Sequence, residues 1–302
     1  MSVGPRVSVV VPSFNQASFL GDCLECLARY PADVCEILVL DGGSSDGSVE
    51  VIRKYEHRIA YWQSTSDDGQ SAALLKGFRL ARGSIFGWLN SDDRLIDGAL
   101  HTVIDYFARH PSIQWAYGDH DFIDVEGCRL SSRYVASVDY QELYWGDRYL
   151  PQEAVFFLRD MYFKVGEINP DLPLTMDFDL WLRMARLAPP GKIPATLGEF
   201  RRHPGQKTSD IDAYHAAARR NRSAHPAPPA PSVLRRLSWA LKHATYRYTR
   251  TTVEHGILSV VTEVNARRRG VRSWPPGHAD EPSRRMLLWE EPHPHERTER
   301  DP

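Results

Sequence analysis

Residues 7–15 read Val-Ser-Val-Val-Val-Pro-Ser-Phe-Asn, a β-branched apolar run that stops at a proline and a polar cluster. Such a run is typical of a strand that is buried on both faces of a sheet. Residues 36–40, Glu-Ile-Leu-Val-Leu, repeat the pattern and end at a second polar cluster, residues 41–47. Because apolar residues at helical spacing lie between the two runs, the chain alternates strand and helix signals from its start.

The alternation continues along the chain. Short apolar runs at residues 59–62 and 85–89 indicate strands, and residues 71–82 between them have a helical pattern. A β-α-β rhythm with short connections predicts a parallel sheet covered by helices, and such sheets bind ligands at the carboxyl ends of their strands. Polar clusters follow these ends at residues 13–16, 41–46, 67–71 and 90–93. We therefore expect an α/β fold whose binding site is formed by these loops.

Composition restricts the class of protein. With 302 residues, 42% hydrophobic and 25% charged, the chain has room for one large globular domain and an appendage. A formal net charge of −2 gives no reason to expect a nucleic-acid partner. No signal peptide is evident, and no apolar stretch approaches the ~20 residues that span a bilayer. We expect a cytoplasmic protein that at most lies on the inner face of the membrane.

Three groups of acidic residues can carry chemistry. Asp41 follows an apolar strand, where it either forms the tight Asp-Gly-Gly turn or accepts a hydrogen bond from a ligand. Asp92 and Asp93 are adjacent like charges that a divalent cation would keep ionised, although they can equally cap the helix that follows. Asp177 and Asp179 open an amphipathic helix, either as capping charges or with one of them as a general base.

Five motifs in this order resemble those of glycosyltransferase family 2. They are Val-Val-Val-Pro-Ser-Phe-Asn at 9–15, Val-Leu-Asp-Gly-Gly-Ser-Ser-Asp-Gly-Ser at 39–48, Asp-Gly-Gln-Ser at 68–71, Trp-Leu-Asn-Ser-Asp-Asp at 88–93 and Asp-Phe-Asp-Leu-Trp-Leu-Arg at 177–183. The resemblance implies a GT-A fold, with a mostly parallel sheet flanked by helices. It also implies inverting transfer of a sugar from a nucleotide-diphosphate donor, UDP or dTDP being favoured, to a hydroxyl of a glycan, a lipid-linked molecule or a small molecule.

The resemblance implies a role for each matching residue. Asp177 would be the general base that takes the proton of the acceptor hydroxyl. Asp92 would hold a divalent cation, Mn²⁺ or Mg²⁺, with Asp93 and His203 beside it. The donor nucleotide would be bound by Pro12, Ser13, Asp41, Gln70, Lys76, Asn90 and Ser91.

The chain departs from the family's pattern at three positions. Asn90 stands where the first aspartate of the metal triplet is common, Met176 replaces a glutamate that often precedes the base, and Ala72 replaces a common aspartate. These changes leave open a degenerate domain that binds a nucleotide sugar or a partner without turnover. A nicotinamide dehydrogenase is disfavoured because residues 12–19 contain no glycine for the G-x-G-x-x-G turn.

Two further sets of residues can each be interpreted in two ways. Gln152 and the three aromatic residues before it lie in a region that faces the acceptor in similar proteins, but such aromatic residues are also common in cores. The aromatic residues are Tyr144, Trp145 and Tyr149. Cys23 and Cys26 form a C-x-x-C pair, which indicates either half of a metal or redox site or two buried small residues.

The C-terminal part divides by composition. We expect a glycosyltransferase domain over residues 1–223, a proline-rich linker over 224–232, a basic amphipathic helical segment over 233–272 and a disordered tail over 273–302. The basic segment carries nine Lys/Arg and two Glu. Its apolar stripe can lie on an anionic membrane, pack on the domain or pair with a second copy, so the oligomeric state stays open. The stripe consists of Leu234, Leu237, Leu241, Ala244 and Tyr248.

Overall fold

The computed structural model describes residues 6–146, 149–206 and 211–269, with the backbone alone described for residues 211 and 252–269. The chain up to Arg250 forms one compact unit, and a second unit begins at Thr251. The expected disordered tail over 273–302 lies outside the described residues.

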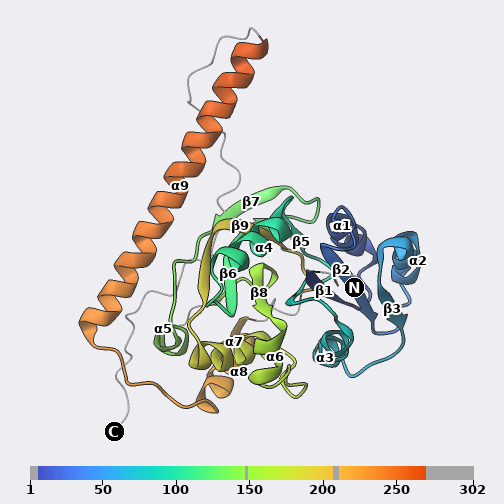
Figure 1. Ribbon diagram of the computed structural model, residues 1–302, viewed down its shortest axis with the longest axis horizontal. Helices are drawn as coiled ribbons and strands as arrows, with labels where there is room; N and C mark the ends of the chain where they lie inside the picture. The colour runs from blue at the N-terminus through green and yellow to red at the C-terminus, as the bar shows by residue number, and fades with distance from the viewer. Residues whose placement is uncertain (1–5, 147–148, 207–210, 270–302) are drawn as a thin grey trace. The chain divides into compact units, whose positions relative to one another are not determined.

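The described strands are β1 (Val7–Ser13), β2 (Cys35–Asp41), β3 (Tyr61–Ser64), β4 (Ile85–Trp88), β5 (Arg94–Leu95), β6 (Trp115–Ile123), β7 (Arg129–Arg133), β8 (Val155–Leu158) and β9 (Gly191–Arg201). The first four occur where the apolar runs predict them. The α-helices are α1 (Ala17–Ala28), α2 (Ser48–Lys54), α3 (Gln70–Leu80), α4 (Ala99–Arg109), α5 (Tyr140–Trp145), α6 (Arg159–Lys164), α7 (Met176–Leu187), α8 (Ile211–Ser223) and α9 (Val233–Arg269). Two 3₁₀ turns, η1 (Glu56–Arg58) and η2 (Gln152–Ala154), complete the described elements (Figure 1).

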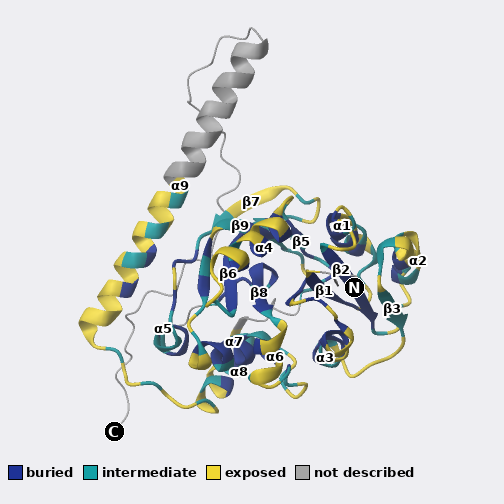
Figure 2. Cartoon of the chain, viewed as in Figure 1, coloured by how far each residue is buried: buried dark blue, intermediate teal, exposed yellow. Residues whose placement is uncertain are grey.

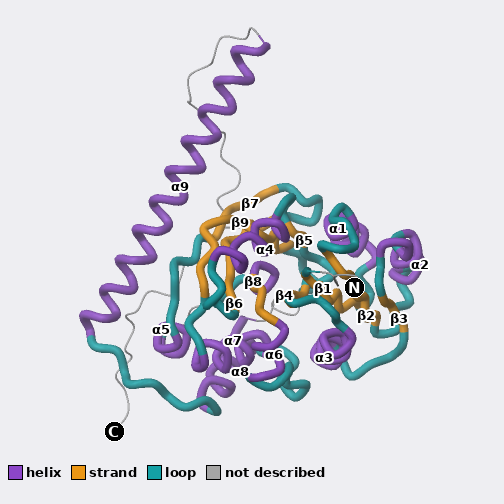
Figure 3. Tube along the Cα trace, viewed as in Figure 1, coloured by secondary structure: helices purple, strands orange, loops and turns teal. Residues whose placement is uncertain are grey.

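The strands form one curled mixed sheet with the order β3-β2-β1-β4-β8-β6-β9-β5, and β7 pairs with β6. Its first half is parallel, since β1 pairs in parallel with β2 and β4, and β2 with β3. Strand β8 then joins antiparallel to both β4 and β6. The predicted α/β class is confirmed, and the parallel arrangement holds in the half from which the strand signals came. Figure 3 shows this central sheet with helices around it.

Successive residues of β1 pack into opposite cores, as a strand buried on both faces requires. Val10 belongs to the core that contains α3 and α7, whereas Val9 and Val11 belong to the core that contains α1 and α4. The buried strands lie between helices whose outer faces are exposed (Figure 2). Gly77 brings α3 onto the sheet, because a Cβ there would lie 2.4 Å from Cγ1 of Val10. The N-terminus of α3 is thereby held beside the end of β4.

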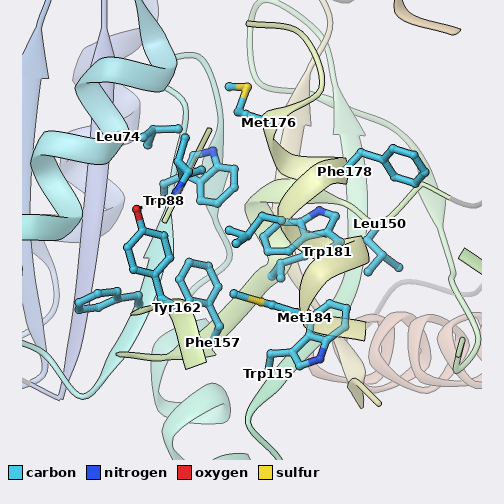
Figure 4. Packing of buried hydrophobic residues seen from close by; sticks show 14 of the residues in the cluster. Leu74, Trp88, Trp115, Leu150, Phe157, Tyr162, Met176, Phe178, Trp181 and Met184 are labelled. Carbon is cyan, nitrogen blue, oxygen red and sulfur yellow. Dashed lines mark hydrogen bonds between the residues drawn. The ribbon is translucent and has the colours of Figure 1, made fainter. Parts of the chain in front are cut away.

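Aromatic rings fill the core between α3 and α7. Trp88 of β4 and Trp181 of α7 stack with their ring centroids 5.4 Å apart, and Trp181 also stacks on Trp115 of β6 at 6.0 Å. Figure 4 shows Trp88 between Leu74 of α3 and Trp181. This packing fixes α7 against the strand end that precedes the Asn-Ser-Asp-Asp loop.

The proline-rich segment lies along α5 instead of bridging two bodies. Its backbone carbonyls accept hydrogen bonds from three α5 side chains: Tyr140 Oη to Pro226 at 2.6 Å, Gln141 Nε2 to Pro229 at 2.7 Å and Trp145 Nε1 to Pro228 at 3.1 Å. The expected linker and the first half of α9 therefore belong to the unit that ends at Arg250. Of the helices that the structure describes, none combines the length and the apolar character needed to cross a membrane.

Candidate active site

The loop after β4 is tied to the start of α3 by the side chain of Asn90. Its Oδ1 accepts a hydrogen bond from Gln70 Nε2 at 2.7 Å, and its Nδ2 donates to Asp93 Oδ2 at 3.2 Å. The loop closes on itself where Asp93 N donates to the Asn90 carbonyl at 3.0 Å. Ser91 is buried within this loop. Three of the predicted donor-site residues, Gln70, Asn90 and Ser91, are thus brought together.

Asp92 and His203 meet although they are 111 residues apart in sequence. His203 Nε2 lies 3.0 Å from Asp92 Oδ2, and the two side chains are 7% and 16% exposed. The imidazole also packs on the Phe19 ring of α1, with the centroids 4.7 Å apart. Two of the three predicted metal residues therefore form a pair that remains partly open to solvent.

Asp93, the third predicted metal residue, has both oxygens directed into the protein. Oδ1 accepts from Arg201 N at 2.9 Å, and Oδ2 accepts from Asn90. Burial, followed by the charges of Asp92 and Glu153, raises its pKa well above the ordinary value. In this arrangement Asp93 supports the loop, and its assignment to the metal stays a prediction.

Arg201 fixes the backbone around the pair. Its guanidinium is fully buried and donates to the Asp92 carbonyl at 2.9 Å, to the Val125 carbonyl at 2.9 Å and to Asp22 Oδ2 at 2.8 Å. Through these hydrogen bonds Arg201 fixes the backbone of the loop at Asp92. A buried cation under a carbonyl-lined turn is a stable arrangement because each donor finds an acceptor.

The Asp92–His203 pair fits two ligands of a divalent cation. In this structure the two atoms are at hydrogen-bond distance, 3.0 Å, which is also the separation of about 3.0 Å between adjacent ligands of an octahedral ion with bonds of about 2.1 Å. Within the described part of the chain, no group of three or more His, Cys, Asp or Glu side chains is placed to hold a metal. A cation here would complete its shell with water and phosphate oxygens, as Mg²⁺ and Mn²⁺ commonly do.

Asp177 is the residue that is predicted to be the general base. It lies in the first turn of α7, and its Oδ1 is buried and accepts no hydrogen bond from any described residue. Burial, opposed by backbone hydrogen bonds and reinforced by Glu153 and Asp179, raises its pKa to about 6. A carboxylate of that pKa is ionised at neutral pH and binds a proton more strongly than an ordinary aspartate.

Asp179 has structural partners that Asp177 lacks. Its Oδ2 accepts from Arg183 Nη2 at 2.6 Å, and its Oδ1 lies 3.0 Å from His225 Nε2. Burial opposes the effect of these partners, but together they lower the pKa of Asp179. Of the two acidic residues at the start of α7, Asp177 is therefore the one available for chemistry.

Glu153, a residue without a predicted role, contributes negative charge to both parts of the site. This buried carboxylate of η2 raises the pKa of both Asp93 and Asp177. It pairs with His120 Nδ1, and Nε2 of that ring is buried without a partner among the described residues. Gln152 beside it donates to the Trp88 carbonyl at 2.8 Å, and its buried Oε1 accepts no hydrogen bond from the residues that the structure describes. Only the position of Glu153 next to Gln152 could have drawn attention to it.

Three of the residues that are predicted to bind the donor lie at the ends of β1 and β2. Pro12 and Ser13 end β1, and the buried Ser13 Oγ has no hydrogen-bond partner in the described structure. Asp41 is fully buried and accepts from Ser44 N at 2.9 Å and Ser64 Oγ at 2.6 Å, so it organises the turn in this structure. Lys76 is exposed two turns into α3 and donates to Gln63. Its contact with a donor stays a prediction.

The aromatic residues before Gln152 have intramolecular contacts. Tyr144 is buried in the core, Trp145 donates to the proline-rich segment, and Tyr149 Oη lies 3.0 Å from His215 Nδ1. Cys23 and Cys26 are buried free thiols, and burial raises the pKa of Cys26 to about 12. The interpretation as buried small residues holds for both cysteines.

Residues 8–164, more than half of the chain, match the family model described as glycosyl transferase family 2. The chain belongs to glycosyltransferase family 2. An uncharacterized glycosyltransferase of Mycobacterium tuberculosis is 29% identical over 205 residues, covering 66% of this chain and 76% of that protein. Chondroitin synthase of Escherichia coli is 25% identical over 187 residues, covering 61% of this chain and 27% of the synthase. Membership of the family makes the protein a glycosyltransferase.

Solved structures of two transferases have the same fold. Staphylococcus aureus TarS 1–349 in complex with UDP-GlcNAc aligns with a TM-score of 0.55 at 16% identity, covering 72% of this chain and 65% of that one. The mannosyltransferase PcManGT of Pyrobaculum calidifontis in complex with GDP-Man and Mn²⁺ aligns at 0.55 and 17%, covering 88% and 81%. At these identities the likeness shows the fold, which confirms the predicted GT-A architecture.

Proposed function

We propose that this glycosyltransferase transfers a sugar with inversion from a nucleotide-diphosphate donor to an acceptor hydroxyl, with Asp177 as the general base. The observation that carries the proposal is the buried Oδ1 of Asp177, which has no hydrogen-bond partner among the described residues and belongs to a carboxylate whose pKa is raised to about 6. Asp179, two residues on, is already paired. The start of α7 thus offers one carboxylate for proton transfer.

In this reaction the acceptor oxygen attacks the anomeric carbon from the face opposite the leaving nucleotide. The C–O bond to the acceptor forms as the bond to the diphosphate breaks, and Asp177 takes the hydroxyl proton. An exposed aspartate would be a weak base at neutral pH. Burial of Asp177 strengthens it while leaving it ionised above about pH 6.

Asp92 and His203 would hold the divalent cation, which when bound neutralises the diphosphate of the donor and orients it. Arg201 keeps the Asp92 backbone in place, and Asn90 joins this loop to the N-terminus of α3. Helix N-termini favour negative charge, so a donor phosphate beside Gln70 would be stabilised there as well. Pro12, Ser13, Asp41 and Lys76 are proposed to border the nucleoside.

A uridine or thymidine diphosphate donor is proposed, and the acceptor is proposed to be a hydroxyl of a glycan, a lipid-linked molecule or a small molecule. The family resemblance favours these nucleotides. The neighbouring structures are complexes of UDP-GlcNAc in one transferase and GDP-Man in another. A guanosine donor is therefore the alternative to include in any test.

The test is binding followed by turnover. Purified protein is heated with UDP, dTDP, GDP or CMP, each with Mn²⁺ or EDTA, and Asp92→Ala is measured in parallel. A ligand that binds the native state alone raises the melting temperature, so a metal-dependent shift that Asp92→Ala abolishes identifies the donor nucleotide. Release of that nucleoside diphosphate from its sugar donors then reports turnover. If a nucleotide shifts the melting temperature but no nucleoside diphosphate is released in the presence of any hydroxyl acceptor, the protein binds the donor without turnover. That result would refute the proposed reaction.

A further inference from the structure

The first half of α9 is fixed on the catalytic unit by ion pairs with buried carboxylates. Glu142 of α5 is fully buried and lies 2.6 Å from His243 Nε2. Asp119 of β6, also fully buried, lies 3.0 Å from Arg250 Nε and accepts a hydrogen bond from Tyr246 Oη at 2.9 Å. These contacts fix one face of the helix, so the opposite face is displayed in a constant orientation.

The displayed face is the apolar stripe of the sequence. At about 100° per residue, Leu237 and Leu241 lie opposite the docked residues Trp239 and His243. Trp239 and His243 are 6% and 5% exposed, whereas Leu237 and Leu241 are 60% and 69% exposed. Figure 2 shows this part of α9 largely exposed. The stripe continues to the start of the helix, where Val233 is 73% and Leu234 77% exposed.

The charges beside the stripe are all positive. Residues 233–250 contain five arginines and lysines and no aspartate or glutamate. Arg236 and Arg247 are exposed and flank the stripe on one side. Arg235 and Lys242 lie on the other side and also pair with Asp139 and Glu142. Among the residues that the structure describes, the positive charge beside the stripe that pairs with no carboxylate is therefore that of Arg236 and Arg247. An exposed apolar row bordered by exposed arginines is a pattern of helices that lie in the interface of a bilayer.

We propose that residues 233–250 form a docking surface for an anionic lipid membrane, with the leucine stripe in the headgroup region and the arginines on lipid phosphates. Charge complementarity selects this occupant. A second copy of the same stripe would bring Arg236 and Arg247 against like charges, whereas an anionic bilayer supplies a counter-charge to both arginines. The surface would place the enzyme on a membrane whatever sugar it transfers.

The test is flotation of the full chain with vesicles of phosphatidylcholine alone or of phosphatidylcholine with phosphatidylglycerol. The wild-type protein should float with the anionic vesicles and lose binding as salt is added. The double variant Arg236→Glu/Arg247→Glu should partition at least about 25-fold less, from about fivefold for each arginine. Leu237→Ser/Leu241→Ser should lose flotation too, because the apolar anchor is removed.

Two matched variants control for surface changes elsewhere. Leu130→Ser removes an exposed leucine of β7, and Arg109→Glu reverses an exposed arginine of α4. Both should float like the wild type, and thermal melting checks that every variant is folded. Equal flotation of wild type and Leu237→Ser/Leu241→Ser, or no flotation of the wild type, would overturn the proposal. So would a wild-type dimer in sedimentation equilibrium that becomes monomeric in this variant, since a second copy would then cover the stripe.

Discussion

Asp177→Asn should change activity and stability in opposite directions. The substitution keeps the size of the side chain and removes its charge and basicity. Loss of a positioned general base lowers the rate by about 10²–10⁴-fold. Because the base acts in the chemical step, the loss should appear in kcat, with the KM for the donor little changed.

The stability effect follows from the raised pKa. Asp177 titrates at about 6 in the folded protein against an ordinary value of 3.8, so the folded state binds this proton more tightly than the unfolded chain does. Ionisation of the folded protein therefore costs free energy, and stability falls as pH rises from about 4 to 6. About two pKa units correspond to about 3 kcal/mol. Asp177→Asn removes this cost and should raise the free energy of unfolding by up to about 3 kcal/mol above pH 6, with no gain below pH 4.

Urea denaturation of wild type and variant at pH 7.5 and pH 4 measures this difference, and initial rates of nucleotide release measure activity. The wild-type kcat/KM should rise with pH and level off above about pH 6, as the free enzyme's base ionises. Asp179→Asn is the matched control. Its carboxylate has a lowered pKa and two partners, so that variant should be destabilised at pH 7.5. If Asp177→Asn is less stable than the wild type and keeps activity within tenfold of it, Asp177 stabilises the fold. That result would refute its role as the base.

Three further outcomes are expected. His203→Ala should weaken Mn²⁺-dependent nucleotide binding by about tenfold or more in calorimetry, because one of two ligands is lost; unchanged metal dependence would remove His203 from the site. Asn90→Asp places a second carboxylate beside buried Asp93, so it should lower the melting temperature in EDTA and regain it in Mn²⁺; equal melting in both would contradict a cation at this loop. His243→Ala removes one of the two partners of fully buried Glu142 and leaves Lys242, so it should cost about 1–3 kcal/mol in urea denaturation; an unchanged free energy of unfolding would mean that α9 is held by other contacts.

The parallel half of the sheet was predictable because a continuous apolar run indicates a strand that is buried on both faces. Val9 to Val11 and Ile37 to Val39 are buried as their apolar runs require, and the polar loops follow those strands. Asp92 and His203 could be assigned to one site through the resemblance. The direction of the Asp93 side chain could not, since it depends on the backbone N–H of Arg201, which only the fold brings near.

The C-terminal helix shows where periodicity misleads. Its leucine stripe has the spacing of a face that packs on a protein, yet the structure exposes Leu237 and Leu241 and buries Trp239 and His243. The docked face is set by Glu142 and Asp119, buried carboxylates from distant parts of the chain. Once buried, these carboxylates require cationic partners. Lys242 of α9 pairs with Glu142, and Arg250 of α9 joins Lys192 of β9 in pairing with Asp119. A pattern confined to the helix could not reveal that requirement.

The departure at Met176 is consistent with the proposed base. Met176 is buried in the core that holds Trp88 and Trp181, directly before Asp177. An apolar neighbour adds to the burial that raises the pKa of Asp177, whereas a glutamate there would add a like charge beside Glu153 and Asp179. Asp177 already reaches a pKa of about 6 without a glutamate at position 176. A further like charge would raise the pKa of Asp177 above that value, so methionine at position 176 keeps a larger fraction of the base ionised at any given pH.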